Sequence, residues 1–114
     1  MGELIDFTEQ LNQNASFELQ GHEIGDATAS LILIHYLRPG MGPKLHQHPY
    51  PEIFITIEGR ARFTVGNETM IVSAGQIAVA PANTPHKFVG IGDDPLRQVD
   101  IHCSPTFQTE WLED

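Results

Sequence analysis

The stretch that decides the fold spans residues 40–59 and reads GMGPKLHQHPYPEIFITIEG. His46 and His48 lie one residue apart in a segment that reads as extended, so both imidazoles project from the same face of the chain. Glu52 follows across a corner formed by residues 49–51. Two histidines buried on one face without a metal would leave several ring nitrogens in need of partners. The pattern therefore favours a metal site over a pair of core histidines.

A third histidine, His86, follows Pro85 much later in the chain. With His46, His48 and Glu52 it completes a set of three imidazoles and one carboxylate. Imidazole suits Fe, Ni, Cu and Zn, whereas a carboxylate suits harder ions such as Mn, so the residue types do not distinguish among these metals. We expect one divalent transition-metal ion per subunit, with a coordination position left open for water or a ligand.

Outward from this stretch, the chain reads as short strands separated by turns. Residues 29–37 form an apolar run, residues 53–57 are β-branched or aromatic, and residues 60–65 alternate strictly between polar and apolar. Gly66-Asn67 predicts a hairpin between that last strand and residues 69–72. Further strands are expected at 76–80, 86–89 and 96–102. Short strands at this spacing indicate an all-β sandwich or small barrel.

The two ends of the chain carry patterns typical of short helices. Within residues 1–17, apolar residues recur at helical spacing. At the other end, Ser104 suits an N-cap and Pro105 the first helical position, so we expect a helical tail. We therefore expect one domain made of an N-terminal extension with helix and strand (1–28), a β-barrel (29–103) and a C-terminal helical tail (104–114).

The composition limits the possible partners. The chain has 114 residues with 15 acidic and 6 basic side chains, which give a formal net charge of −9. This excess argues against nucleic-acid binding, because a protein that binds the phosphate backbone needs a basic patch. The single cysteine, Cys103, cannot form an internal disulfide, and no apolar stretch reaches the length of a membrane span. With a start that lacks a basic signal region, these features predict a cytoplasmic protein without a membrane partner.

The first motif resembles the first signature of the cupin superfamily. Every fixed position is present, in the spacing Gly40-x5-His46-x-His48-x3-Glu52-x6-Gly59. The resemblance implies a single double-stranded β-helix, or jelly-roll barrel, of the RmlC-like cupin type. It also implies that the metal ligands of the family carry over onto His46, His48, Glu52 and His86.

A second motif, fifteen residues further on, is similar to the second cupin signature. It reads Gly75-x5-Pro81-x-Asn83-x2-His86-x3-Gly90. Asn83 stands where the family usually has Gly, and Gly90 stands where it usually has Asn. Asn tolerates the left-handed backbone conformation better than most residues, so Asn83 can hold the same turn.

Strand parity predicts the wall of the pocket around the metal. Phe54 and Thr56 share a face with Glu52, and Phe88 shares a face with His86. We expect these three residues beside the open metal position.

Three further residues are candidates for acid–base catalysis: Asp100, His102 and Tyr50. Asp100 and His102 share one face of the last expected strand, and Val99 and Ile101 share the other. Apolar patterning favours Val99 and Ile101 inside. If the polar face looks inward instead, Asp100 or His102 would orient a metal-binding histidine or transfer a proton. Tyr50 would place its hydroxyl near the mouth of the cavity.

Two expected strands, 29–37 and 53–57, are apolar on both faces. In the second of them Phe54 points one way, and Ile53, Ile55 and Ile57 point the other. A strand exposed to water on one side would alternate, so both faces are expected to be covered. A chain this short has few helices to cover them, which predicts a homodimer built on the outer faces.

A complete metal site in a small barrel suits two classes of function. The first is an enzyme, a dioxygenase, decarboxylase, isomerase or lyase acting on a small carboxylate or hydroxy-carbonyl compound. The second is a non-catalytic sensor or binding module for a small metabolite. A storage role like that of seed cupins is not favoured by a single short barrel. Because a fold does not determine the reaction, the choice between enzyme and binding module stays open at this stage.

Overall fold

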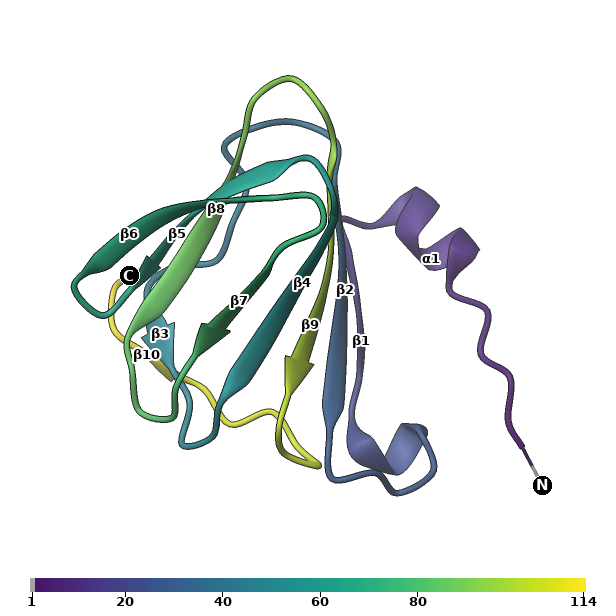
Figure 1. Ribbon diagram of the computed structural model, residues 1–114. Helices are drawn as coiled ribbons and strands as arrows, with labels where there is room; N and C mark the ends of the chain where they lie inside the picture. The colour runs from purple at the N-terminus through teal and green to yellow at the C-terminus, as the bar shows by residue number, and fades with distance from the viewer. Residues whose placement is uncertain (1) are drawn as a thin grey trace.

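The computed structural model describes residues 2–114 and consists almost entirely of β-strands (Figure 1). Two five-stranded antiparallel sheets pack face to face, which confirms the predicted all-β jelly-roll class. The first sheet has the order β1-β2-β9-β4-β7, and the second sheet has the order β10-β3-β8-β5-β6. The strands span Ser16–Leu19 (β1), Ser30–Tyr36 (β2), His46–Gln47 (β3), Glu52–Glu58 (β4), Arg60–Val65 (β5), Glu68–Ser73 (β6), Ile77–Ala80 (β7), His86–Ile91 (β8), Leu96–His102 (β9) and Glu110–Trp111 (β10).

From β2 onward the chain crosses repeatedly between the two sheets. β2, β4, β7 and β9 belong to the first sheet, whereas β3, β5, β6, β8 and β10 belong to the second. This alternation winds the chain as a double-stranded β-helix. It also brings the starts of β4 and β8, the end of β9 and the short strand β3 to the lower end of the barrel in Figure 1.

The strands predicted from the sequence are all present, each within two residues of its expected ends. The hairpin at Gly66-Asn67 is confirmed, because Val65 pairs with Glu68 across it. β1, which pairs with β2, lies in the N-terminal extension, where helix and strand were expected. β10, which pairs with β3, was not predicted.

The N-terminal part contains the expected short helix as α1, Thr8–Gln13, followed by a single turn of 3₁₀ helix, η1, at Gly21–Glu23. Neither helix buries a large part of the core, and α1 contains no buried residue. Within residues 2–114, no helix combines the length and the apolar character needed to cross a bilayer.

The predicted helical tail over residues 104–114 is wrong. After Ser104 the chain runs without helix and ends in β10, which pairs with β3. The backbone N–H of Gln108 donates to the Tyr50 hydroxyl at 3.2 Å. Backbone groups that a helix would satisfy internally therefore bond to other segments, and these tertiary contacts override the local helix signal.

The preference for Val99 and Ile101 inside the barrel is also wrong. Asp100 and His102 are 2% and 3% exposed and face the interior, whereas Val99 and Ile101 are half-buried on the outer face. The register explains this outcome, because His102 pairs directly with the inward-facing Glu52. Residues that pair directly across two strands share a face of the sheet.

Aromatic side chains fill the barrel one rung beyond the histidines. Phe54 follows Glu52 on the inner face of β4, and Phe88 follows His86 on the inner face of β8. The ring of Phe63 lies 5.0 Å from that of Phe54 and 5.1 Å from that of Phe88. The core therefore begins immediately beyond the polar end of the barrel.

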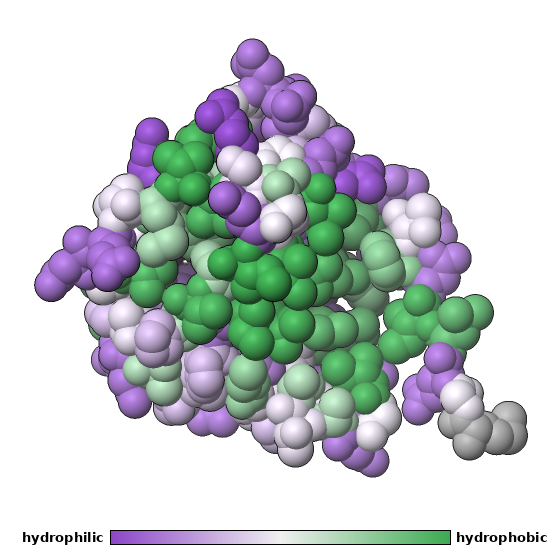
Figure 2. Space-filling view, in the orientation of Figure 1, coloured by the Kyte–Doolittle hydropathy of each residue, from purple (hydrophilic) through white to green (hydrophobic). Residues whose placement is uncertain are grey.

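The outer side of the first sheet carries two apolar rungs, here called the outer apolar face. One rung is Val79, Ile53, Ile101 and Leu31, and the other is Ile77, Ile55, Val99 and Leu33. Ile77 and Val79 are 62% and 52% exposed. Figure 2 shows apolar side chains gathered over the middle of the molecule, where β4 and β7 lie in Figure 1.

Asn83 has the left-handed conformation expected of it, with a φ of 58°. Its N–H donates to the carbonyl of His48 at 2.7 Å. The turn of the second motif is thereby fastened to the first motif beside the histidines.

Two motif glycines have different surroundings, so replacing each by alanine should lower the free energy of unfolding by different amounts. Gly59 and Gly75 both have positive φ, 79° and 88°. A methyl group at residue 59 would also overlap the carbonyl of Pro95, whereas one at residue 75 would meet no atom within 4 Å. We expect Gly75→Ala to lower the free energy of unfolding by about 1–2 kcal/mol. We expect Gly59→Ala to lower it by about 3 kcal/mol or more. Urea unfolding of both variants measures the difference, and equal losses would contradict the role assigned to the Pro95 contact.

Candidate metal centre

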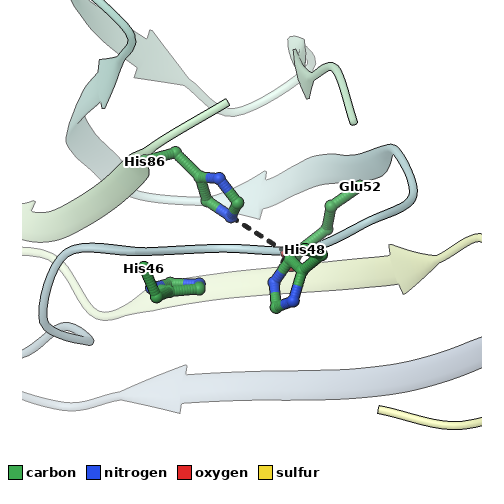
Figure 3. Close-up of side chains that lie close together, drawn as sticks. All are labelled: His46, His48, Glu52 and His86. Carbon is green, nitrogen blue, oxygen red and sulfur yellow. Dashed lines mark hydrogen bonds and ion pairs between the residues drawn. The ribbon is translucent and has the colours of Figure 1, made fainter. Parts of the chain in front are cut away.

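The four residues predicted as metal ligands come together at one end of the barrel. All four are buried and their candidate ligand atoms lie within 4.8 Å of one another: His46, His48, Glu52 and His86. β3 and the residue after it supply the first two, and the first residues of β4 and β8 supply the others. Segments distant in sequence meet here because His46 pairs with His86 across β3 and β8. Figure 3 shows the four side chains converging.

A shared arrangement orients the three imidazole rings. The Nδ1 atom of each ring lies within hydrogen-bond distance of a backbone carbonyl oxygen. The pairs are His46 with Lys44 at 2.6 Å, His48 with Gln108 at 2.8 Å and His86 with Thr84 at 2.8 Å. A carbonyl oxygen only accepts, so each Nδ1 carries the proton and each Nε2 presents a lone pair. This is the tautomer in which a neutral imidazole binds a metal through Nε2.

The carboxylate of Glu52 faces two of these lone pairs. Its Oε1 atom lies 2.9 Å from Nε2 of His48 and 3.2 Å from Nε2 of His86. Acceptor atoms this close repel one another unless a cation lies among them. Three imidazoles and one carboxylate are also donors that Mn, Fe, Ni, Cu and Zn accept. The cluster therefore fits a metal site.

The surroundings of the cluster favour the protonation states that a metal requires. Burial lowers the pKa of His46 to about 4, against the effect of the Lys44 carbonyl and with a further contribution from His86 and His48. His46 is therefore neutral near pH 7. Burial by itself raises the pKa of Glu52, but the interaction with His102 comes first among the effects that outweigh burial and hold this pKa below its usual range. Glu52 is therefore an anion.

His102 lies on the other side of the Glu52 carboxylate and differs from the three histidines above. Its Nε2 lies 3.2 Å from Oε2 of Glu52, and its Nδ1 lies 2.6 Å from the hydroxyl of Tyr50. That hydroxyl already accepts the N–H of Gln108, so its own proton is free to point at Nδ1. In this arrangement Nε2 of His102 carries a proton and faces the Glu52 carboxylate. The chain Tyr50–His102–Glu52 therefore holds the carboxylate in position, which is the role of an outer partner of a metal ligand.

A cavity of about 320 Å³ adjoins the cluster. Its size lies at the lower end of the range of small-molecule sites. Besides His46, His48 and Glu52, its wall includes Ser16 and Glu18 from β1, Ile32, Ile34 and Tyr36 from β2, Phe88 from β8, Asp100 and His102 from β9, and Phe107, Thr109 and Trp111 from the C-terminal segment.

The predicted pocket residues occupy two different positions. Phe88 lines the cavity. Phe54 and Thr56 face the barrel interior and are each 1% exposed, and neither is among the residues that line the cavity. The ring of Phe54 packs 5.7 Å from that of His86 and supports it from behind.

The parts of the wall that come from β1 and the C-terminal segment were not predicted from the sequence. The Trp111 ring lies 5.1 Å from that of His46, and the Phe107 ring lies 4.9 Å from that of His102. The available signal was these two large aromatic residues in a short polar tail, for which a helix was expected instead.

Comparison with known proteins agrees with this geometry. Residues 33–102 match the family described as Cupin domain. Polyketide synthase CurC of Streptomyces cyaneus is 35% identical over 80 residues, which are 69% of this chain and 51% of that protein. This chain therefore spans about half the length of CurC.

The similar solved structures include oxalate decarboxylases. The formate complex of the Lactobacillus farciminis enzyme has a TM-score of 0.76 and 26% identity over 87% of this chain and 32% of that one. A Bacillus subtilis oxalate decarboxylase with Mn(II) centres has a TM-score of 0.76 and 26% identity over 85% of this chain and 27% of its own. This chain thus spans about a third or less of these enzymes.

The lowered pKa of His46 predicts how the stability of the metal-free protein depends on pH. In the unfolded chain a histidine has its ordinary pKa of about 6.5, whereas folded His46 has a pKa of about 4. Between these values the unfolded state binds more protons at this residue, so the free energy of unfolding falls as the pH falls through this window. The slope from this one group is at most about 1.4 kcal/mol per pH unit.

Urea unfolding of chelator-treated protein from about pH 7.5 to about pH 4.5 measures that slope. His46→Gln keeps an uncharged polar side chain and removes the titration, so we expect a shallower pH dependence in this variant. An identical slope in the two proteins would contradict the lowered pKa.

Proposed function

The chain belongs to the cupin family, and from that premise we propose that it binds one divalent transition-metal ion through His46, His48, Glu52 and His86. With this ion the protein binds and transforms a small carboxylate or hydroxy-carbonyl compound. The observation that carries this proposal is the set of oriented Nε2 lone pairs that face the Glu52 carboxylate at 2.9 and 3.2 Å. A divalent ion in this site would supply Lewis acidity toward the oxygen atoms of the bound compound.

The donor set supports Mn, Fe, Ni, Cu and Zn alike. The similarity to an oxalate decarboxylase with Mn(II) centres supports Mn as the first metal to examine. The ligand class is supported by the small cavity and by the similarity to an oxalate decarboxylase solved with formate. A turnover assay distinguishes among decarboxylation, isomerisation, lyase and dioxygenase chemistry.

Some residues around the cluster orient the Glu52 carboxylate, and others exclude water from the cavity. His102 and Tyr50 keep the Glu52 carboxylate turned toward the cluster. Apolar residues, including Phe88 and Phe107, line the cavity and limit the water beside the bound compound. Asp100 is a buried titratable group of the wall and is the candidate for accepting or delivering a proton.

Metal content tests the proposed ligands directly. We expect protein purified without a chelating tag to contain about one equivalent of a transition metal and His86→Ala to contain less than about a tenth of that. Adding the metal at about a hundred times its Kd should stabilise the wild type by about 2.7 kcal/mol and leave His86→Ala unchanged. The exposed His22 supplies the matched control, because His22→Ala should behave as the wild type does. A wild type that neither contains nor responds to any of the five metals would overturn the proposal.

A turnover assay separates catalysis from binding. The metal-loaded protein is mixed with oxalate, pyruvate or glycerate, and the concentration of each compound is measured by NMR in air and under nitrogen. We expect the protein to consume at least one of these compounds. Consumption of the compound in air but not under nitrogen would assign dioxygenase chemistry. Binding without turnover, with all five metals, would instead support a non-catalytic binding module.

We further propose that a second copy of the chain covers the outer apolar face, because two complete apolar rungs cross four strands there. A symmetric contact needs a self-complementary patch, and isoleucine and valine rungs satisfy that condition. The expected cytoplasmic location and the absence of nucleic-acid and membrane partners stay predictions.

Light scattering on a sizing column tests this contact. We expect a particle of twice the 12.7 kDa chain mass for the wild type and a monomer for Ile77→Lys. Ile71 is 47% exposed on the second sheet, so Ile71→Lys is the matched control and should remain a dimer. A monomeric wild type, or a dimeric Ile77→Lys together with a monomeric Ile71→Lys, would contradict the assignment.

A further inference from the structure

We propose that Asp100 determines the specificity of the cavity by binding a hydrogen-bond-donating group at the far end of a ligand whose near end coordinates the ion. The inference rests on the proposed function and narrows its substrate class. The favoured ligand carries a hydroxy-acid or keto-acid head and a neutral or positively charged far end, such as a hydroxyl or an ammonium group. A second carboxylate at the far end is disfavoured.

Asp100 lies close to the cluster along β9. It lies one rung inward from His102 on β9, and its backbone pairs with Phe54 on one side and with Ile32 on the other. Two residues of an antiparallel strand span about 7 Å, which a ligand of three or four heavy atoms bridges. The side chain is 2% exposed and yet lines the same cavity as Glu52.

The carboxyl group of Asp100 is held in place by one neutral partner. The side-chain N–H of Gln98 donates to its Oδ1 atom at 2.6 Å. Among residues 2–114, Asp100 forms no salt bridge. One hydrogen bond compensates little of the cost of burying a carboxyl group, so Asp100 lowers the stability of the fold. A role in ligand binding therefore accounts for its position better than a role in stability.

Two further polar groups lie one rung beyond Asp100. The Oε1 atom of Gln98 and the Oγ1 atom of Thr56 are buried and have no hydrogen-bond partner among the described residues. These two residues pair directly across β4 and β9. The inner face of this strand pair therefore carries more hydrogen-bonding groups than the folded chain itself can pair.

The charge around Asp100 determines which far ends are accepted. Burial first, and then the charge of Glu52, raise the pKa of Asp100 well above its usual range. Tyr36 lines the cavity from β2, and burial and the charge of Asp100 raise the pKa of its hydroxyl to about 12. Burial and the negative neighbours together oppose a second carboxylate here. The negative neighbours attract an ammonium group, and a hydroxyl group avoids the cost of burying a charge.

Apolar side chains line the cavity at the level of Asp100 and beyond it. Ile32 pairs with Asp100 and Ile34 pairs with Gln98, both from β2, and Phe88 comes from β8. The hydrocarbon part of a ligand that reaches Asp100 would pack against this wall.

Four hydroxy acids that differ only at the far end test the inference. Lactate, glycerate, isoserine and malate share the 2-hydroxy-carboxylate head and end in methyl, hydroxyl, ammonium and carboxylate groups. The protein is loaded with Co²⁺, which gives a visible spectrum that reports coordination of the head, and Kd is measured by calorimetry. We expect glycerate and isoserine to bind more tightly than lactate, and malate to bind at least about tenfold more weakly than isoserine.

Asp100→Asn keeps the size of the side chain and should reduce the preference for isoserine over malate to less than about threefold, with unchanged Co²⁺ content. Asp94 is exposed, so Asp94→Asn is the matched control and should keep the wild-type order. The wild-type order requires no variant, so it tests the inference even if Asp100→Asn does not fold.

The outcomes separate this inference from the proposed function. If all four acids change the Co²⁺ spectrum with equal Kd, or if folded Asp100→Asn keeps the wild-type order, the role of Asp100 is overturned and the metal-dependent function stands. If Co²⁺ binds but no acid changes its spectrum or releases heat, the proposed ligand class is overturned and the inference with it.

Discussion

The register between β4 and β9 is the constraint on which the rest of the structure depends. Glu52 pairs with His102 and Phe54 pairs with Asp100, so alternate residues of both strands face the barrel interior together. The same register turns Ile53 outward, into the outer apolar face. A slip of one residue would exchange the two sets, exposing the carboxylate and histidine and burying isoleucines in their place. One ladder of backbone hydrogen bonds therefore determines both the metal cluster and the surface proposed to bind a second copy.

The cluster is built at a cost to the metal-free fold. Glu52 is 3% exposed, and its oxygen atoms face nitrogen lone pairs rather than water. The rings cannot turn away easily, because the carbonyl groups of Lys44, Thr84 and Gln108 hold them through Nδ1. Packing of Phe54 against His86 adds to this restraint. A site held in this way requires little rearrangement when a cation enters, so stability given up in the empty fold is recovered as metal affinity.

The strands and the four clustered residues could be predicted because their signals are local or fixed in spacing. Alternation marked residues 60–65, and the motif spacing selected the ligands without any knowledge of the sheets. The inward orientation of Asp100 could not be read from its own strand, because pairing with β4 decides it. Likewise, Ser104-Pro105 is a sound local helix start, but the backbone of Gln108 bonds to His48 and Tyr50 instead. Both errors arose where a contact distant in sequence outweighed a local pattern.

The two ends of the cavity differ in charge. This difference bears on whether the substrate of the similar oxalate decarboxylases would suit this chain. A divalent ion with Glu52 leaves a net charge of about +1 at one end, although the chain as a whole carries −9. At the other end, Asp100 and Tyr36 lie where burial and negative neighbours raise both pKa values, which disfavours added negative charge. A ligand aligned along this axis is stabilised at both ends only if it is itself polarised, anionic at the ion and neutral or positive at Asp100. A symmetric dicarboxylate matches one end alone. Similarity in fold and metal cluster therefore does not by itself carry the substrate of those enzymes over to this chain.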